Sequence, residues 1–166
     1  MGLCKLIDAL LLIYFLFIAI VAPLFDSQAC LPSHLYPEIL LEAQSWYVSE
    51  YGDYLVAEKP HFFVGLIGVE LLLQWPLSIA NVYGIMAKKS WYSTTCLIQG
   101  VSTFTSMVAI LSELLGSQKA SDKLLMVYGP FLGVAVIAVL RGLVPALKKT
   151  SGTPVAKSSA ARKKRA

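Results

Sequence analysis

Four long segments without charged residues constrain this chain more than any other feature. They cover residues 9–25, 61–87, 90–112 and 124–140, and one acid, Glu70, interrupts the second of them. A bilayer core about 30 Å thick requires about 20 helical residues, and inside hydrocarbon a single segment satisfies its backbone groups only as a helix. We therefore predict an all-α, polytopic membrane protein with a bundle of four transmembrane helices.

Composition argues against a water-soluble globular domain. Only 14% of the 166 residues are Asp, Glu, Lys or Arg, whereas ordinary soluble domains have about 25%. The three cysteines lack the spacing of a zinc site or a disulfide framework, so we expect no metal and no cofactor. We also expect no nucleic-acid partner, because the basic residues near the C-terminus are not interleaved with aromatic residues that could stack on bases.

One membrane domain is expected over residues 1–147. Its spans extend into flanking residues and lie at about 6–29, 61–87, 90–113 and 124–147. Residues 148–166 are rich in Lys, Ser and Ala and contain no acid, so they are predicted to form a disordered basic tail.

The distribution of Lys and Arg predicts the orientation in the membrane. Most of the 14 basic residues lie in the N-terminus, in the second loop and from Arg141 onward, which places both termini in the cytosol. Lys163 and Lys164 then resemble a dilysine signal that retrieves proteins to the endoplasmic reticulum membrane, although a basic flank that touches anionic lipid is the alternative. For the first span the alternative is a cleaved signal peptide, with a small-x-small site at Ser27-Gln28-Ala29.

The first loop contains a helical pattern after Pro37. Ile39, Leu40, Trp46 and Tyr47 recur at helical spacing with polar residues between them. This predicts a short amphipathic helix on the luminal interface that covers the bundle.

Glu70 is the strongest functional indicator. A carboxylate at the bilayer centre costs about 2.5–3.5 kcal/mol, so Glu70 is expected to face the bundle interior. Gln74 follows at i+4 on the same face. Pro76 cannot donate an N–H, which leaves the carbonyl of Leu72 without its helical partner.

Asp26 ends the first span. The charge-free run reaches only about 25 Å, so we expect the helix to continue for a turn and to draw Asp26 below the interface. A solvated aspartate at a helix end is the alternative. Pro23 should free the carbonyl of Ala19 and kink the helix.

Polar and small residues also recur in the third and fourth spans. A polar stripe in the third span indicates either hydrogen bonds between helices or a ligand site. The stripe consists of Thr95, Gln99, Ser102, Thr103 and Ser106. In the fourth span, Tyr128 and Pro130 lie in the luminal half, and Gly129 and Gly133 permit close helix contact, either within the bundle or in a homodimer.

A cavity is expected in the luminal half, because Pro23, Pro76 and Pro130 should bend their helices apart there. Asp26 and Glu70 would be its only acids. Two carboxyl groups in an apolar pocket do not both ionise cheaply, so we expect them to share a proton. Such a site suits an amphiphile with a cationic amine or a sterol hydroxyl.

Six motifs in one register resemble the sigma-2 receptor group of the EXPERA superfamily, which also contains the emopamil-binding sterol isomerases. The motifs are Asp26-x-Gln28-Ala-x-Leu31-Pro32, Trp46-Tyr47, Glu50-x-x-Asp53, Glu70-x-x-x-Gln74-x-Pro76, Ile110-Leu-Ser112 and Tyr128-x-Pro130. The resemblance implies a protein of the endoplasmic reticulum that binds sterols and hydrophobic amines and serves cholesterol homeostasis.

The resemblance also implies roles for single residues. Asp26 would pair with a ligand amine, Glu70 would be its hydrogen-bonding neighbour, and Asp53 would be a structural acid in the loop. Gln74, Ser106 and Tyr128 would line the pocket. Ser102 stands where the group often has histidine, so ligand selectivity does not transfer.

Three functions remain open at this point. The leading interpretation is a receptor-like sterol or amine binder without catalytic residues. The first alternative is a sterol double-bond isomerase, which the absence of any histidine deep in a span disfavours, since His34 and His61 lie at the luminal edge. The second is a membrane scaffold that regulates a partner protein in sterol transport.

Overall fold

The computed structural model describes residues 2–151 and gives side-chain surroundings through residue 144. The described part consists of helices joined by short turns and contains no strand, which confirms the all-α prediction. The segments are α1 (Gly2–Leu24), η1 (Asp26–Ala29), η2 (Ser33–Leu35), α2 (Glu38–Tyr51), α3 (Tyr54–Glu58), α4 (His61–Val69), η3 (Glu70–Gln74), α5 (Trp75–Met86), α6 (Tyr92–Gly116) and α7 (Asp122–Ser151).

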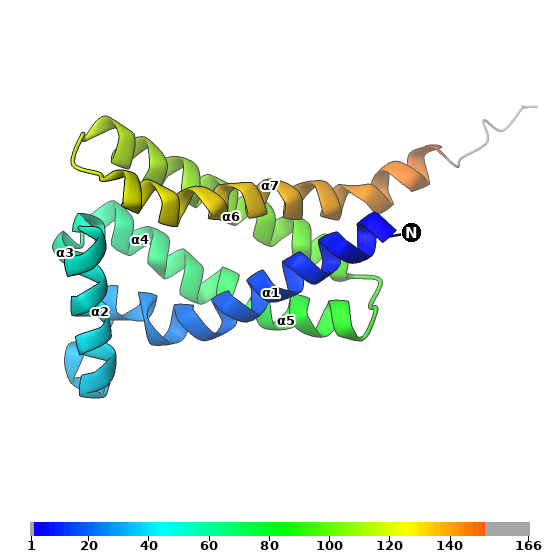
Figure 1. Cartoon of the computed structure of the whole chain (residues 1–166). Coiled ribbons are helices and arrows are strands. Elements are labelled where there is room, and N and C mark those ends of the chain that lie inside the picture. Colours follow the sequence, from blue (N-terminus) through cyan, green and yellow to red (C-terminus); the bar gives the residue numbers. More distant parts are fainter. Residues whose placement is uncertain (1, 152–166) are drawn as a thin grey trace, which may run out of the picture.

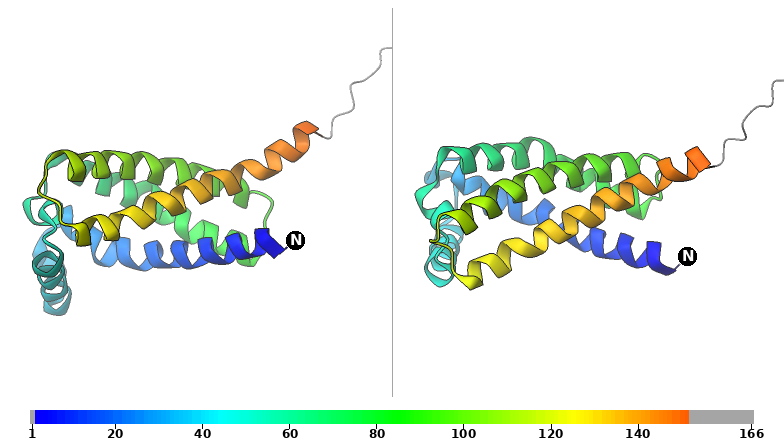
Figure 2. Two further views of the ribbon diagram at one scale, coloured as in Figure 1. Left: turned by 45° about the horizontal axis from the view of Figure 1, so that its top comes forward. Right: turned by 90° about the horizontal axis from the view of Figure 1, so that it is seen from above.

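Four stretches are long and apolar enough to cross a membrane, which confirms the predicted number of spans. They are Gly2–Ala29, His61–Met86, Tyr92–Gly116 and Asp122–Val144. The spans alternate in direction, so the N-terminus, the α5–α6 turn and the end of α7 lie together at one end of the bundle, called here the terminal end (Figure 1). The opposite end, called the lid end, carries α2, α3 and the α6–α7 turn, as both views in Figure 2 show.

The helix α2 lies across the lid end, roughly perpendicular to the spans (Figure 1). It begins directly after Pro37, as predicted, and ends at Gly52, whose φ of +66° is a left-handed conformation that glycine adopts without strain. The predicted amphipathic helix of the first loop is therefore present, and Tyr47 on this helix reaches the bundle interior.

The helix α7 is longer than its predicted span. It continues to Ser151, beyond the boundary expected at residue 147. No glycine or proline occurs between Ala146 and Ser151, so nothing in this stretch breaks the helix. Residues 152–166, with the predicted retrieval signal at Lys163 and Lys164, lie outside the described residues.

Close contact between α6 and α7 depends on two glycines that the sequence did not single out. A Cβ atom on Gly142 would lie 2.6 Å from Cβ of Leu97, and one on Gly100 would lie 2.8 Å from the backbone nitrogen of Val139. Gly129 and Gly133, which permit close contact either within the bundle or in a homodimer, have open space around them. Among the described residues no neighbour packs closely on either glycine, and the homodimer stays a prediction.

The end of α1 satisfies its free carbonyls with side chains, as the absence of water in a bilayer requires. Pro23 cannot donate to the carbonyl of Ala19, and the indole N–H of Trp75 does so instead at 3.1 Å. Ser27 donates to the carbonyl of Pro23 at 2.6 Å. The α-helix itself ends at Leu24, and the predicted extra turn is the tighter 3₁₀ helix η1, which begins with Asp26.

The second span widens directly before Pro76. Residues of η3 form a π-helical turn in which the N–H of Trp75 donates to the carbonyl of Glu70, five residues back. Turns of this type frequently occur at functional sites. Of the three prolines expected to bend helices, Pro76 follows the π-helical turn, and Pro23 lies just before α1 gives way to the 3₁₀ helix η1. The helix α7 continues unbroken through Pro130.

Apolar side chains form two clusters along the bundle. The first lies toward the terminal end and includes Leu11, Phe15, Ile18, Cys96 and Ala138. The second lies toward the lid end and includes Leu55, Phe63, Ile67, Ile110 and Leu124. The two clusters are the hydrophobic core, and residues of both also line the cavity described next.

Candidate functional site

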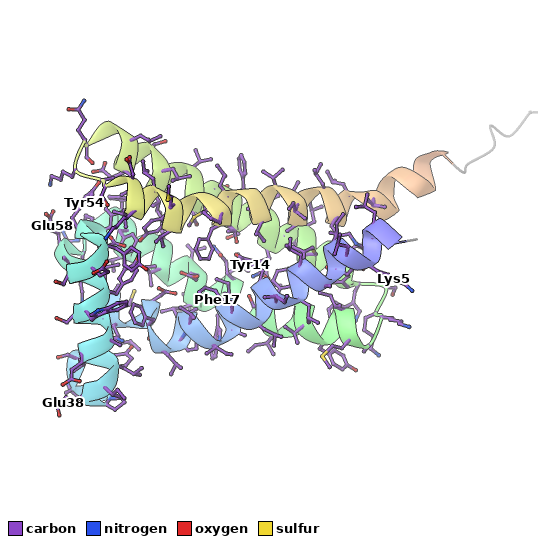
Figure 3. The ribbon with its side chains drawn as sticks, in the orientation of Figure 1. Lys5, Tyr14, Phe17, Glu38, Tyr54 and Glu58 are labelled. Atoms are coloured by element: carbon purple, nitrogen blue, oxygen red, sulfur yellow. The ribbon has the colours of Figure 1, made fainter. Side chains whose placement is uncertain are left out.

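A cavity of about 340 Å³ lies in the lid half of the bundle. This volume falls within the range of about 300–1,000 Å³ found for small-molecule sites. Most of the lining is apolar or aromatic: Ile18, Val21, Phe25, Phe63, Leu66, Ile67, Met107, Ile110 and Phe131. Tyr14 and Phe17, labelled in Figure 3, project from α1, and their ring centroids lie 6.3 and 6.0 Å from that of Phe131 on α7.

Asp26 and Glu70 line this same cavity from two different segments. Asp26 is held by the 3₁₀ turn η1 and Glu70 by the π-helical turn η3. Among residues 2–144, no side chain or backbone N–H donates a hydrogen bond to either carboxyl group. Two acids in an apolar chamber therefore have hydrogen-bonding capacity that the described protein does not use.

Gln74 also lines the cavity, and both the nitrogen and the oxygen of its amide bond to α6. Its nitrogen donates to the hydroxyl of Ser102 at 3.1 Å, and its oxygen accepts from Thr103 at 2.9 Å. The Tyr14 hydroxyl lies 3.4 Å from the Thr103 hydroxyl, so α1 joins the same network. These bonds hold the π-helical turn, which also contains Glu70, against α6.

The remaining polar stripe of α6 forms a hydrogen-bonded ladder with α5. Thr95 donates to Asn81 at 2.6 Å, Asn81 donates to Gln99 at 2.8 Å, and Gln99 donates to Ser78 at 2.6 Å. Thr95 and Gln99 thus form the hydrogen bonds between helices that the first interpretation expects. Ser106 lines the cavity, and a ligand there stays a prediction. The sequence analysis missed Ser78 and Asn81, although with Gln74 they repeat at i, i+4 and i+7.

Asp53 occupies a separate site beside the cavity and is completely buried. One oxygen accepts from the backbone N–H groups of Leu55 and Val56, which makes Asp53 the N-cap of α3. The other accepts from the hydroxyls of Tyr47 at 3.0 Å and Tyr128 at 2.8 Å. Tyr47 and Tyr128 line the cavity with their rings, while both hydroxyls are committed to Asp53.

Burial and the neighbouring carboxylate of Asp53 raise the pKa of the Tyr47 phenol. Tyr47 therefore remains a protonated donor at neutral pH. This network joins α2, the start of α3 and α7, so it holds α2 and α3 in place across the lid end of the bundle.

The structure thus brings five of the six predicted site residues to one cavity, namely Asp26, Glu70, Gln74, Ser106 and Tyr128. Asp53 supports this group through two tyrosines. Within the described residues no cluster of His, Cys, Asp and Glu is arranged to hold a metal ion.

Comparison with known proteins identifies the family of this chain. The family EXPERA (EXPanded EBP superfamily) matches residues 39–142. Sigma intracellular receptor 2 of Macaca fascicularis is 31% identical and that of Homo sapiens 30% identical, each over 152 residues that cover 82% of this chain and 86% of the relative. The Xenopus tropicalis protein of the same name is 27% identical over 154 residues, covering 84% of this chain and 90% of the relative. This chain therefore belongs to the sigma-2 receptor group of the EXPERA family.

Proposed function

We propose that this protein binds a sterol or a hydrophobic amine in the cavity that Asp26 and Glu70 line. The observation that carries the proposal is the presence of two carboxyl groups that accept no hydrogen bond from the described residues, in an apolar chamber of about 340 Å³. An unpaired carboxylate in such surroundings is costly unless a cation or a hydrogen-bond donor reaches it. A lipophilic ammonium or a sterol hydroxyl supplies that partner, and the apolar lining accommodates the rest of the ligand.

The aromatic lining favours a cationic amine further. Tyr14, Phe17, Phe25 and Phe131 present rings to the cavity, and an ammonium group held near such rings gains cation–π attraction. In this proposal Asp26 pairs with the amine, and Glu70 shares a proton with Asp26 and accepts or donates the second hydrogen bond.

Binding of a radiolabelled lipophilic amine to the purified full chain tests the proposal. Asp26→Asn should weaken binding at least about 100-fold, because the amide cannot pair with the ammonium charge. Asp122→Asn is the matched control, since Asp122 is exposed at the start of α7 and lies outside the cavity. Unchanged affinity in a folded Asp26→Asn protein would contradict the proposal.

A photoactivatable sterol distinguishes the two ligand classes. Asp26→Asn should reduce sterol crosslinking much less than amine binding, because the asparagine amide still bonds to a hydroxyl. An excess of the amine should displace the sterol from cavity peptides. Crosslinks that persist under this competition would place the sterol elsewhere.

The finer cellular role is part of the same proposal. We infer that the protein resides in the endoplasmic reticulum membrane with both termini cytosolic, and that it serves sterol homeostasis. Support comes from the distribution of basic residues and from the family. A partner in sterol transport and a homodimer remain predictions.

Two native cysteines provide a test of the orientation. Cys4 is exposed at the terminal end and Cys30 at the lid end, whereas Cys96 is buried. In sealed microsomes a membrane-impermeant maleimide should label Cys4, and Cys30 only after permeabilisation. Burial raises the pKa of the Cys30 thiol, so labelling is best carried out at alkaline pH. The reverse order of labelling would invert the predicted topology.

An isomerase is the second candidate, because two carboxyl groups facing one cavity could supply an acid and a base for moving a double bond. Expression in a yeast strain that lacks sterol isomerase tests it. Restored growth that depends on Glu70 would support catalysis. Failure to restore growth despite good expression would favour a binder.

A further inference from the structure

A second cavity lies at the terminal end of the bundle, far from the carboxyl groups of the first. Its volume is about 220 Å³, and residues of α1, α5, α6, α7 and the α5–α6 turn line it. The charged lining consists of Asp8, Lys88, Lys89 and Arg141. Three basic residues and one acidic residue give this small cavity a formal charge of +2. The two charged residues that line the first cavity are both acids.

Asp8 neutralises one of the three bases. Arg141 donates to both carboxylate oxygens of Asp8, at 2.7 and 3.1 Å, and Tyr92 donates to the same group at 3.4 Å. The guanidinium also lies 5.4 Å from the centre of the Tyr92 ring. This bidentate pair ties the first span to the last and forms the inner wall of the cavity.

Lys88 and Lys89 remain as the unneutralised charges. Lys88 has a φ of +50°, a left-handed conformation that closes the tight turn after α5. The backbone N–H groups of both lysines are bonded to carbonyls of Ile85 and Gly84, so only their side chains are available to a ligand. Among the described residues, no carboxylate lies within ion-pair distance of either ammonium group.

The lysines at the lid end differ in this respect. Lys123 pairs with Glu50 at 3.0 Å, and Lys119 lies 3.7 Å from Glu58. Two exposed lysines thus pair with carboxylates at one end of the bundle, and two beside a cavity at the other end have no carboxylate partner in the part of the chain that the structure describes. This asymmetry indicates that the terminal cavity suits an anion from outside the described chain.

We propose that this second cavity binds a phosphate monoester, carried either by a lipid headgroup of the adjoining leaflet or by a soluble phosphate ester. A monoester dianion matches the net charge of +2. The ammonium groups of the two lysines supply donors for its oxygens. The cavity lies where the spans end, which is the depth of lipid headgroups, and basic pockets between membrane helices are known to hold such groups.

Native mass spectrometry of the purified full chain with phosphatidic acid tests this proposal. The variant K88Q/K89Q should bind phosphatidic acid roughly 25-fold more weakly, since each lysine near an anionic lipid contributes about fivefold. The matched control K119Q/K123Q removes the same charge at the lid end and should stay within about twofold of the unchanged chain. All four lysines are exposed, so folding should be preserved.

Further arms of the experiment separate the outcomes. Phosphatidylglycerol, a diester with one charge, should bind more weakly than phosphatidic acid. Glycerol 3-phosphate is added as a competitor of phosphatidic acid. Displacement of the lipid at a similar concentration would show that the cavity binds a soluble phosphate ester. No displacement would show that it binds a lipid headgroup. Equal loss in both double variants, or equal binding of the two lipids, would overturn the proposal. Neither result alters the predicted binding of an amine to the first cavity.

Discussion

Polar side chains between α5 and α6 in the terminal half of the bundle are hydrogen-bonded to one another, whereas two acids that line the cavity in the lid half have no hydrogen-bond donor among the described residues. Between α5 and α6, Ser78, Asn81 and Gln99 bond to one another at 2.6–2.8 Å. Asp26 and Glu70, by contrast, face a cavity without a donor from the described residues. A polar group left unpaired in the interior costs about 1–3 kcal/mol of folding free energy. The hydrogen bonds between α5 and α6 avoid this cost, whereas the two acids at the cavity incur it unless a ligand pairs with them. This difference is the reason for our proposal that a ligand completes the lid half.

Asp53 shows that the lid half does not lack donors. Its carboxylate accepts four hydrogen bonds although it lies beside the cavity. The protein can therefore supply hydrogen-bond donors to an acid in this region, but none of the described residues donates to Asp26 or Glu70.

Removing Asp53 should produce the largest loss of stability. Asp53→Ala deletes the cap of α3 and leaves two tyrosine hydroxyls without their acceptor, so we expect a loss of about 3 kcal/mol in unfolding free energy. Chemical denaturation in detergent measures it, and Glu42→Ala on the exposed face of α2 is the control. Equal stability of the two variants would show that Asp53 is not structural.

Adding a side chain at the close α6–α7 contact should reduce the free energy of unfolding somewhat less than removing Asp53 does. Gly142→Ala places a methyl group against Leu97 and should destabilise the bundle by about 2 kcal/mol. Gly133→Ala, on the open face of the same helix, should leave stability nearly unchanged. A loss of stability at Gly133 would indicate that another molecule packs there, and native gels would then reveal the homodimer.

Two matched leucine variants sharpen the contrast between ladder and cavity. Asn81→Leu and Gln74→Leu each remove two hydrogen bonds to α6 and should each cost about 1 kcal/mol of stability. Only Gln74→Leu should also weaken amine binding, by about fivefold, because Gln74 lines the cavity and supports the turn that carries Glu70. An equal effect of Asn81→Leu on binding would mean that the halves are coupled.

The smallest effect is expected at Trp75. Trp75→Phe removes the donor to the carbonyl of Ala19 and should cost about 0.6 kcal/mol. Trp91→Phe is the control, since Trp91 lies partly exposed in the α5–α6 turn. Greater stability of Trp75→Phe than of Trp91→Phe would show that the carbonyl freed by Pro23 needs no donor.

Much of the cavity was predictable because an acidic side chain within a membrane span is too costly to expose to lipid. Glu70 had to face the interior, and a proline six residues later indicated an irregular turn, although not the π-helical form that the structure shows. The amphipathic pattern after Pro37 likewise predicted α2. The spacing of Gly129 and Gly133 left packing within the bundle and a homodimer equally open, because small residues show that a face can pack closely and not which neighbour it meets.

The sequence by itself determined the number and type of the spans, since the length and polarity of a segment decide locally whether it crosses a bilayer as a helix. Only the tertiary structure decided which polar groups became partners. Asp8 meets Arg141 across 133 residues, and Trp75 meets the carbonyl of Ala19 across 56. Such pairs depend on how each helix is rotated and shifted against its neighbours, and the packing of all four spans together sets that rotation.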